Sequence, residues 1–383
     1  MDMDLCIDNV HFLAKEKEKE KEKEKEKEKN VIELISDNIL SSRDCRESGL
    51  FYSGGFDSSL LLHIMKESGI PFKAYHKEFS GQGNDSEYYI AEKKARLLGV
   101  ELIKIEECFD YSLDSYYEQH YDFPHQIPIC LSYDTSGIIT RGMNYSPIQF
   151  ISGHGGDAVF GQNTNGLACI DALIDNGFFS ACKKSKELAK LKGITFFNII
   201  ENCINQSRIT LSDKHPGKSE HIKNIIESIY SIHPSRHSGS INIIAPILFE
   251  SVIFEFISIP SYEHFDACLD RKIIRQMAAK KYDDFSLLTT NKKSSSNILF
   301  DILNRKQKHI CDIVINKGLL QVINMSEQQF KDMLYLQSNI RYIASDYLLI
   351  HKLYQMAVFL NMFLWQKKNL NSVFLKQGTL YPK

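Results

Sequence analysis

The sequence predicts an α/β fold: a parallel sheet with flanking helices, followed by a mostly helical C-terminal half. Three observations support this. Short strand-like segments alternate with helix-like ones from residue 30 to residue 152. Two of the strand-like segments run directly into glycine-rich turns that also carry an acid. After residue 168 the strand signals fade, and long segments with helical apolar periodicity take over. Strand–helix alternation is typical of parallel sheets that are covered on both faces.

The elements follow one another in a regular order. Residues 1–29 predict a charged flexible segment, because residues 15–29 alternate strictly between Lys and Glu and offer no apolar face. Residues 30–168 predict the α/β core, and residues 169–383 a mainly helical part that completes the same domain. A tyrosine-rich stretch after residue 107 is expected to be helical. The helices expected in the core are 31–40, 58–68 and 85–98; the strands are 49–52, 72–79, 100–107 and 146–152.

Composition limits the classes of function. The 383 residues are 43% hydrophobic and 25% charged, with a net charge of −2. This balance gives no electrostatic reason to expect nucleic acid or a membrane as partner. The nine cysteines include no CxxC pair, which predicts reduced thiols and a cytoplasmic location. No uncharged apolar run reaches the length of a membrane-spanning helix.

The first motif is SGGFDSS, residues 53–59, between a strand and a helix. In a parallel sheet such a turn lies at the carboxyl edge, where ligands bind. Gly54 and Gly55 allow a phosphate to approach the backbone, and the following helix offers free N–H groups. Additional hydroxyl donors are Ser53, Ser58 and Ser59. Asp57 would repel a phosphate unless a cation lay between them, and Mg²⁺ prefers carboxylate and phosphate oxygens. A capped turn without a ligand is the simpler alternative.

The second motif is SGHGGDAVFG, residues 152–161, which again follows a strand. It also satisfies the GxGxxA pattern of a dinucleotide site. However, that pattern belongs to the first βαβ unit and does not explain an acid at Asp157. A single site in which Asp57 and Asp157 hold Mg²⁺ on either side of one triphosphate explains both motifs.

The two motifs together resemble the asparagine synthetase-like branch of the ATP pyrophosphatase, or PP-loop, family over about residues 30–296. The resemblance implies an adenine nucleotide alpha hydrolase-like fold, with ATP and Mg²⁺ as cofactors. It further implies that Asp57 and Asp157 bind Mg²⁺ and that Ser152 and Gly153 lie near the nucleotide. The strand residues Leu50 and Phe51 are expected to wall the adenine.

Position 154 separates the members of this family. Asparagine synthetases have Glu there and β-lactam-forming enzymes have Tyr, whereas SGHGGD most resembles the lasso-peptide macrolactam synthetases. His154 is a candidate base for the attacking amine, because an imidazole is partly neutral near pH 7. The alternative is a histidine that only binds phosphate or orients the loop.

A third element extends from Ala245 to Ser296. Its first part, residues 245–281, resembles the family's proline-containing loop, helix and basic helix, although Phe249-Glu250 matches the family imperfectly. The stretch TTNKKSSSN, residues 289–297, follows. The family places a lysine here, close to the leaving pyrophosphate. Lys292 fits best and Lys293 is the second choice; a solvated lysine pair is the alternative. Such a cation would stabilise the charge that develops on the departing phosphates.

The glutaminase domain of full asparagine synthetases is expected to be missing, because residue 2 is Asp2 rather than the nucleophilic cysteine. The predicted function is therefore an AMP-forming carbon–nitrogen ligase. It would adenylate a carboxylate of a peptide or small molecule and pass it to an amine, giving the macrolactam of a lasso-type peptide. A peptide-processing partner protein is compatible with this. Alternatives are an ammonia-dependent asparagine synthetase, a degenerate nucleotide-binding relative, and an RNA-thiolating enzyme.

Overall fold

The computed structural model describes residues 31–42, 48–79, 87–107, 149–162, 164–210, 214–231, 242–289 and 307–335, with parts of 349–360. The Lys–Glu segment, the tyrosine-rich stretch and both Lys292 and Lys293 lie outside the described residues. The predictions made for them stay predictions.

The centre of the fold is a five-stranded sheet in the order β3-β2-β1-β4-β5, in which every pair of neighbours is parallel. The strands are β1 (Ser48–Phe51), β2 (Phe72–Phe79), β3 (Leu102–Glu107), β4 (Gln149–Ile151) and β5 (Asn242–Ile244). The predicted α/β class and its four core strands are confirmed. The sequence did not indicate β5, which comes from the second half of the chain and has only three residues.

The strand order places two loops side by side. From β1 the chain adds β2 and β3 on one side, and then returns to add β4 and β5 on the other. Ser48 of β1 is in register with Gln149 of β4, so the two strands end at the same level. The turns that follow β1 and β4 therefore meet at the switch point of the sheet, which is where parallel α/β sheets bind ligands.

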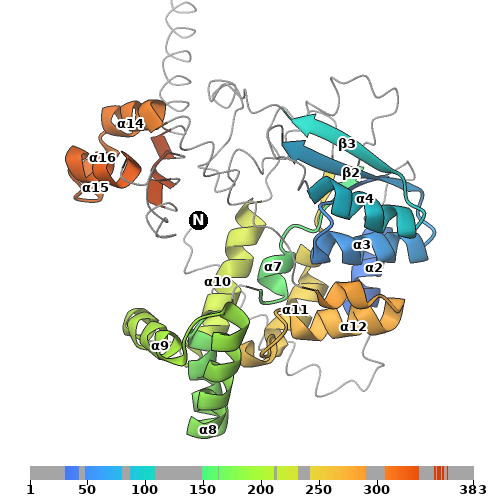
Figure 1. Ribbon diagram of the computed structural model, residues 1–383, viewed down its shortest axis with the longest axis horizontal. Helices are drawn as coiled ribbons and strands as arrows, with labels where there is room; N and C mark the ends of the chain where they lie inside the picture. Colours follow the sequence, from blue (N-terminus) through green and yellow to red (C-terminus); the bar gives the residue numbers. More distant parts are fainter. Residues whose placement is uncertain are drawn as a thin grey trace, which may run out of the picture.

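The helices come from both halves of the chain, and several of them, among them those labelled α3 and α4, lie close to the sheet in Figure 1. Those of the first half are α2 (Val31–Ser41), α3 (Phe56–Glu67), α4 (Glu87–Leu97) and the short α7 (Gly156–Val159). The second half has α8 (Leu167–Lys192), α9 (Phe196–Thr210), α10 (Pro216–Ser231), α11 (Glu250–Ser258), α12 (Lys272–Tyr282), α14 (Gln307–Asn316), α15 (Leu319–Val322) and α16 (Glu327–Tyr335). Short 3₁₀ turns are η3 (Pro246–Leu248), η4 (Ser261–Glu263) and η5 (Phe285–Leu288). None of the helices in the described part of the chain is long and apolar enough to pass through a bilayer.

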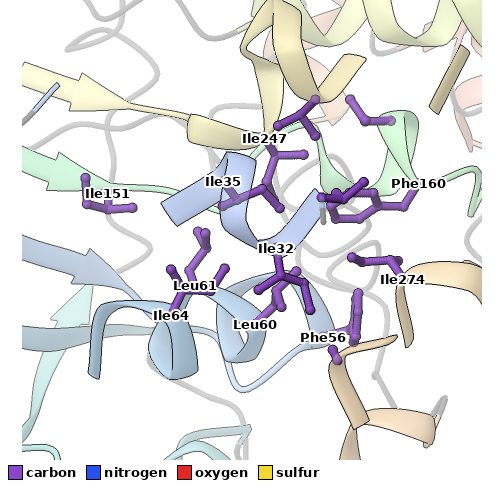
Figure 2. Close-up of a cluster of buried hydrophobic side chains, with 14 of the residues drawn as sticks. Ile32, Ile35, Phe56, Leu60, Leu61, Ile64, Ile151, Phe160, Ile247 and Ile274 are labelled. Carbon is purple, nitrogen blue, oxygen red and sulfur yellow. The ribbon is translucent and has the colours of Figure 1, made fainter. Parts of the chain in front are cut away.

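The main core lies between the sheet and helices from both halves of the chain (Figure 2). The helix α3 is almost completely buried, because its sequence places apolar side chains around most of its circumference. It packs on α2 and α12. The core side chains drawn in Figure 2 include Ile32, Ile35, Leu60, Leu61, Ile64, Ile151, Phe160, Ile247 and Ile274. The start of α3, which carries Asp57, is thus packed against several other elements.

The opposite face of the sheet carries a smaller aromatic cluster. Side chains alternate along a strand, so Phe51 and Phe150 point away from the core that contains Leu50 and Ile151. The rings of Phe51 and Phe150 stack with centroids 4.5 Å apart, and Tyr75 meets Phe150 edge-on. Leu50 is fully buried in the main core, whereas Phe51 is only partly buried.

A buried histidine, His264, contacts the start of α12. His264 is 1% exposed; its carbonyl accepts a hydrogen bond from the backbone N–H of Lys272. Its ring stacks on Phe256 and contacts the ring of His221 edge-on. Burial, together with the neighbouring His221, lowers the pKa of His264 to about 3, from an ordinary value of 6.5.

This shift predicts acid sensitivity with a definite sign. The folded state resists protonation of His264, so its contribution to stability is complete above pH 6.5 and is lost as the pH falls towards 3. The loss amounts to at most about 1.4 kcal/mol for each pH unit. We expect His264→Phe to flatten the fall of the free energy of unfolding, measured by urea denaturation from pH 6.5 downwards. An unchanged slope in the variant would contradict this account.

Candidate active site

The loop after β1 is shaped by its own serines. The backbone N–H of Ser53 donates to Ser58 Oγ at 3.3 Å, and Gly55 N–H donates to Ser53 Oγ at 3.3 Å. Ser58 Oγ in turn donates to the Gly55 carbonyl at 3.2 Å. Gly55 is the N-cap of α3, and no side chain caps that end. The backbone N–H groups of the first turn of α3 are thus not capped by a side chain, which is compatible with the predicted phosphate site.

A lysine that the sequence analysis did not single out supports this loop from α4. Lys94 Nζ donates to the Gly54 carbonyl at 3.1 Å. Gly54 has φ +76°, and a Cβ there would lie 3.2 Å from the backbone of Ala91 on α4. Burial lowers the pKa of Lys94, which Asp284 partly offsets. Only the helical spacing of Ala91 and Lys94 could have suggested that they share the face directed at the loop.

The loop after β4 packs directly on the first. The backbone N–H of His154 donates to Ser152 Oγ at 3.2 Å, and Gly156 N–H donates to the Gly153 carbonyl at 3.2 Å. A Cβ at Gly156 would stand 2.5 Å from Asp57 Cγ, and one at Gly153 would stand 3.1 Å from Asp57 Cβ. Glycine at these positions is therefore what lets the two loops approach one another.

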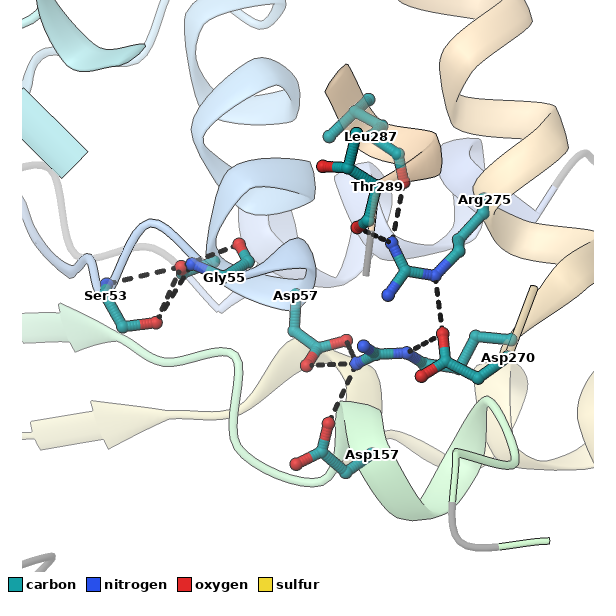
Figure 3. A network of polar contacts seen from close by, with 10 residues as sticks. Ser53, Gly55, Asp57, Asp157, Asp270, Arg275, Leu287 and Thr289 are labelled. Atoms are coloured by element: carbon teal, nitrogen blue, oxygen red, sulfur yellow. Dashed lines mark hydrogen bonds and ion pairs between the residues drawn. The ribbon is translucent and has the colours of Figure 1, made fainter. Parts of the chain in front are cut away.

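The two predicted acids meet at one nitrogen atom. Arg271 Nη1 donates to both carboxylate oxygens of Asp57, at 3.1 and 2.9 Å, and to Asp157 Oδ1 at 2.8 Å. Figure 3 shows Asp57 and Asp157 reaching towards each other from α3 and α7. The acids lie 100 positions apart in the sequence. The structure thus brings together the pair that the sequence predicts to share one cation, and the cation between them is a guanidinium.

A second arginine and a third acid complete what we call the arginine–aspartate cluster: Asp57, Asp157, Asp270, Arg271 and Arg275. Arg275 Nε donates to Asp270 Oδ1 at 2.7 Å, and its Nη1 donates to the carbonyls of Leu287 and Thr289 (Figure 3). Asp270 Oδ1 also lies 3.5 Å from Arg271 Nε.

The electrostatics of the cluster follow from burial and proximity. Burial opposes the charge of Arg271, but Asp57, Asp157 and Asp270 outweigh it and raise the pKa of the guanidinium. Burial and the charge of Arg271 lower the pKa of Arg275, although Asp270 counteracts them. Both arginines lie over the ring of Phe56, with Cζ atoms 5.2 and 4.6 Å from its centroid. These are favourable cation–π geometries.

Neither arginine, nor Asp270, was predicted as a site residue. All three lie in the stretch CLDRKIIR, which belongs to the region that resembles the family's basic helix, but the resemblance assigned no role to them. A cation close to two converging acids was expected only as a metal. The sequence signal that was available is the spacing of Arg271 and Arg275, four residues apart at the start of a helix. This spacing is too common to indicate a site.

The ring of His154 is oriented by a residue of α10. The ring of His154 lies with Nε2 3.1 Å from the carbonyl of Ser228. Since a carbonyl only accepts, the proton belongs on Nε2 and the lone pair of the neutral ring on Nδ1. Burial lowers the pKa of His154, against smaller opposing effects of this hydrogen bond and of Asp157. The ring is therefore neutral at pH 7, as a base must be.

The other predicted residues are placed as follows. Ser59 and Ser152 are buried, and Ser59 Oγ lies 3.4 Å from the Tyr52 hydroxyl. Leu50 is enclosed in the main core, so its side chain is remote from the loop surface, while Phe51 lies on the opposite face of the sheet. Lys292 and Lys293 follow Thr289 closely in sequence, and the Thr289 carbonyl belongs to the environment of Arg275.

The donor set is compatible with Mg²⁺ and a triphosphate. Mg²⁺ in nucleotide sites takes one or two carboxylates and completes its shell with phosphate oxygens and water. Asp57 and Asp157 supply two hard oxygen ligands beside the uncapped helix end. In the described ranges no group of three or more His, Cys, Asp or Glu side chains is placed to hold a metal ion.

The fold is a parallel α/β sheet in which two glycine-rich loops meet at the switch point. Residues 41–168 match the family model of asparagine synthase. The Microcin J25-processing protein McjC of Escherichia coli is 29% identical over 337 residues, which cover 87% of this chain and 64% of that protein. Both findings agree with the predicted resemblance to the asparagine synthetase-like family, which is confirmed as a resemblance. The chain spans less than two thirds of the length of this curated relative.

The chain also has a weak match among solved structures. The U34-tRNA thiolase NcsA from Methanococcus maripaludis, with its [4Fe-4S] cluster, is 14% identical. The match covers 67% of this chain and 77% of that one, with a TM-score of 0.24. A likeness at this level adds nothing to the interpretation of the site.

The contact between the loops predicts a specific effect of Gly156→Ala. The added methyl group collides with the carboxylate of Asp57, so we expect the activity proposed below to be lost. Overpacking of this kind typically costs about 1–3 kcal/mol of stability. A matched control is Gly69→Ala, which strains a left-handed residue by about 1 kcal/mol without meeting any atom within 4 Å. Full activity in Gly156→Ala, or equal loss in the control, would contradict the role of this contact.

Proposed function

We propose that this protein is an ATP-dependent amide ligase of the AMP-forming type, and that its product is a macrolactam in a lasso-type peptide. The observation that carries the proposal is the convergence of Asp57 and Asp157 at the switch point of the sheet, beside the uncapped N-terminus of α3. This edge offers backbone N–H groups for phosphate and carboxylates for a metal.

The reaction divides into two steps. A carboxylate oxygen of the substrate attacks the α-phosphorus of ATP, the bond to the β-phosphate oxygen breaks, and pyrophosphate leaves. An amine nitrogen then attacks the acyl carbon of the adenylate, loses its proton and expels AMP. Both steps transfer a group to a nucleophile, and neither needs an oxidant or reductant.

The residues of the two loops have distinct roles in this scheme. Ser53, Gly55 and the first turn of α3 hold the phosphates that leave. Asp57 and Asp157 would hold Mg²⁺, which would supply positive charge to the phosphates. Lys292 or Lys293 would add a further cation. The segment that carries them follows Thr289, whose carbonyl accepts from Arg275, and this sequence proximity to the cluster supports such a role.

His154 is the candidate base for the second step. Its neutral ring, oriented by the carbonyl of Ser228, has a lone pair on Nδ1 that can take the amine proton. The choice of a peptide substrate rests on two supports. SGHGGD resembles the loop of lasso-peptide cyclases, and the E. coli relative is named as a processing protein for microcin J25.

Exchange of labelled pyrophosphate into ATP tests the first step and identifies the substrate class. We expect exchange that depends on a peptide bearing Asp or Glu. Exchange with free aspartate instead would indicate an ammonia-dependent asparagine synthetase, and no exchange with any carboxylate would indicate a degenerate relative. Asp57→Asn and Asp157→Asn should each reduce the exchange rate at least about a hundredfold, the order expected when a transition-state electrostatic contact is removed.

Replacement of His154 separates the two steps. His154→Ala should leave pyrophosphate exchange intact and slow amide formation by about 10²–10⁴-fold, the usual contribution of a general base. In the unchanged protein, the rate of amide formation should fall as the pH drops through a pKa below 6.5, since protonation removes the lone pair. Loss of exchange in His154→Ala would show that the residue serves nucleotide binding instead.

A further inference from the structure

Arg271 occupies the position between the two acids to which the proposed function assigns a metal. Its side chain is 2% exposed, compared with 11% for Asp57 and 46% for Asp157. A single nitrogen, Nη1, makes all three hydrogen bonds to these acids. The guanidinium is therefore a built-in counter-ion of the site rather than a surface partner.

The backbone fixes Arg271 in this position. The residue has φ +49°, in the left-handed region that side chains other than glycine rarely adopt. Its carbonyl accepts from the N–H of Arg275 in α12, and the N–H of the next residue, Lys272, donates to the His264 carbonyl. Strained backbone that the surroundings hold on both sides is typical of functional positions.

The charges of the arginine–aspartate cluster determine when a divalent cation can bind between Asp57 and Asp157. Three carboxylates and two guanidinium groups leave a formal charge of −1. A divalent cation that approached both Asp57 and Asp157 would be repelled by the positive charge of Arg271 at short range. It would also compete with Arg271 for the same carboxylate oxygens. The negative charge of a triphosphate removes this conflict, because it gives both cations a shared partner.

We propose that Arg271 holds the two acidic loops together in the metal-free protein, and that a divalent cation must displace its guanidinium from Asp57 or Asp157 in order to bind. Metal alone then binds weakly, and metal with nucleotide binds well. This inference rests on the metal role proposed above for the two acids, and it assigns Arg271 a positioning role.

Replacement of Arg271 by methionine tests the inference without any measurement of activity. The probes are Mn²⁺, followed by electron paramagnetic resonance, and Mg²⁺, followed by the melting temperature, both without nucleotide. We expect Arg271→Met to melt lower than the unchanged protein when metal is absent. We also expect it to bind Mn²⁺ at least about tenfold more tightly, within the usual range of coupling between linked sites.

Arg275→Met is the matched control. Arg275 is equally buried and bonds to Asp270, but none of its hydrogen bonds reaches Asp57 or Asp157. It should lose stability without gaining affinity for Mn²⁺. Adding Asp157→Asn to Arg271→Met should remove the gain in affinity, since one of the two ligands is then lost.

Equal Mn²⁺ affinity in Arg271→Met and the unchanged protein would overturn the inference, and so would an equal gain in Arg275→Met. If Arg271→Met does not fold, Arg271→Lys is measured in the same way. Its single ammonium cannot copy the guanidinium geometry, so tighter Mn²⁺ binding than in the unchanged protein supports the inference and no gain overturns it. A failure of pyrophosphate exchange in the unchanged protein would overturn the proposed function, yet it would leave this comparison of metal affinities unaffected.

Discussion

The hydrogen bonds from Arg271 Nη1 to Asp57 and Asp157 are the interaction on which the rest of the site depends. Two like charges would otherwise repel each other at the junction of α3 and α7. Their convergence requires the strand order of the sheet, which puts β1 next to β4, and it requires a cation in the middle. The parallel register brings both loops to the same edge, and the buried guanidinium offsets the repulsion between the two carboxylates there.

Close approach of the loops also restricts which residues can stand there. A Cβ at Gly156 would collide with the carboxylate of Asp57, and one at Gly153 would make an unusually tight contact with Asp57. Gly153 also forms, with Gly155 and Ala158, the GxGxxA pattern that resembles a dinucleotide fingerprint. Here Gly153 contacts the first loop, so one sequence pattern serves a different geometry. The function of such a motif can be assigned only when the element that it packs against is known.

The helical second half of the chain takes part in the site directly. It supplies β5 to the sheet, Ser228 to the His154 ring, and the Arg271 and Arg275 side chains to the cluster. Asp171 further ties α8 to the start of α10, where it accepts from the N–H groups of Gly217 and Lys218. The division at residue 168 is thus a change in secondary-structure content, while the sheet and the site are built from both sides of it.

The sequence by itself determined the α/β class, four of the five strands, the two glycine-rich loops and the acids that they carry. These features are local: periodicity, turn residues and motif spacing are readable without knowing what packs on what. Only the tertiary structure decided that β5 extends the sheet, that Lys94 supports the Gly54 loop, and that Arg271 stands between Asp57 and Asp157. Each of these depends on contacts between residues that lie 40 or more positions apart in the sequence. An arginine that follows Leu-Asp near a helix start looks ordinary until the fold places two carboxylates around it.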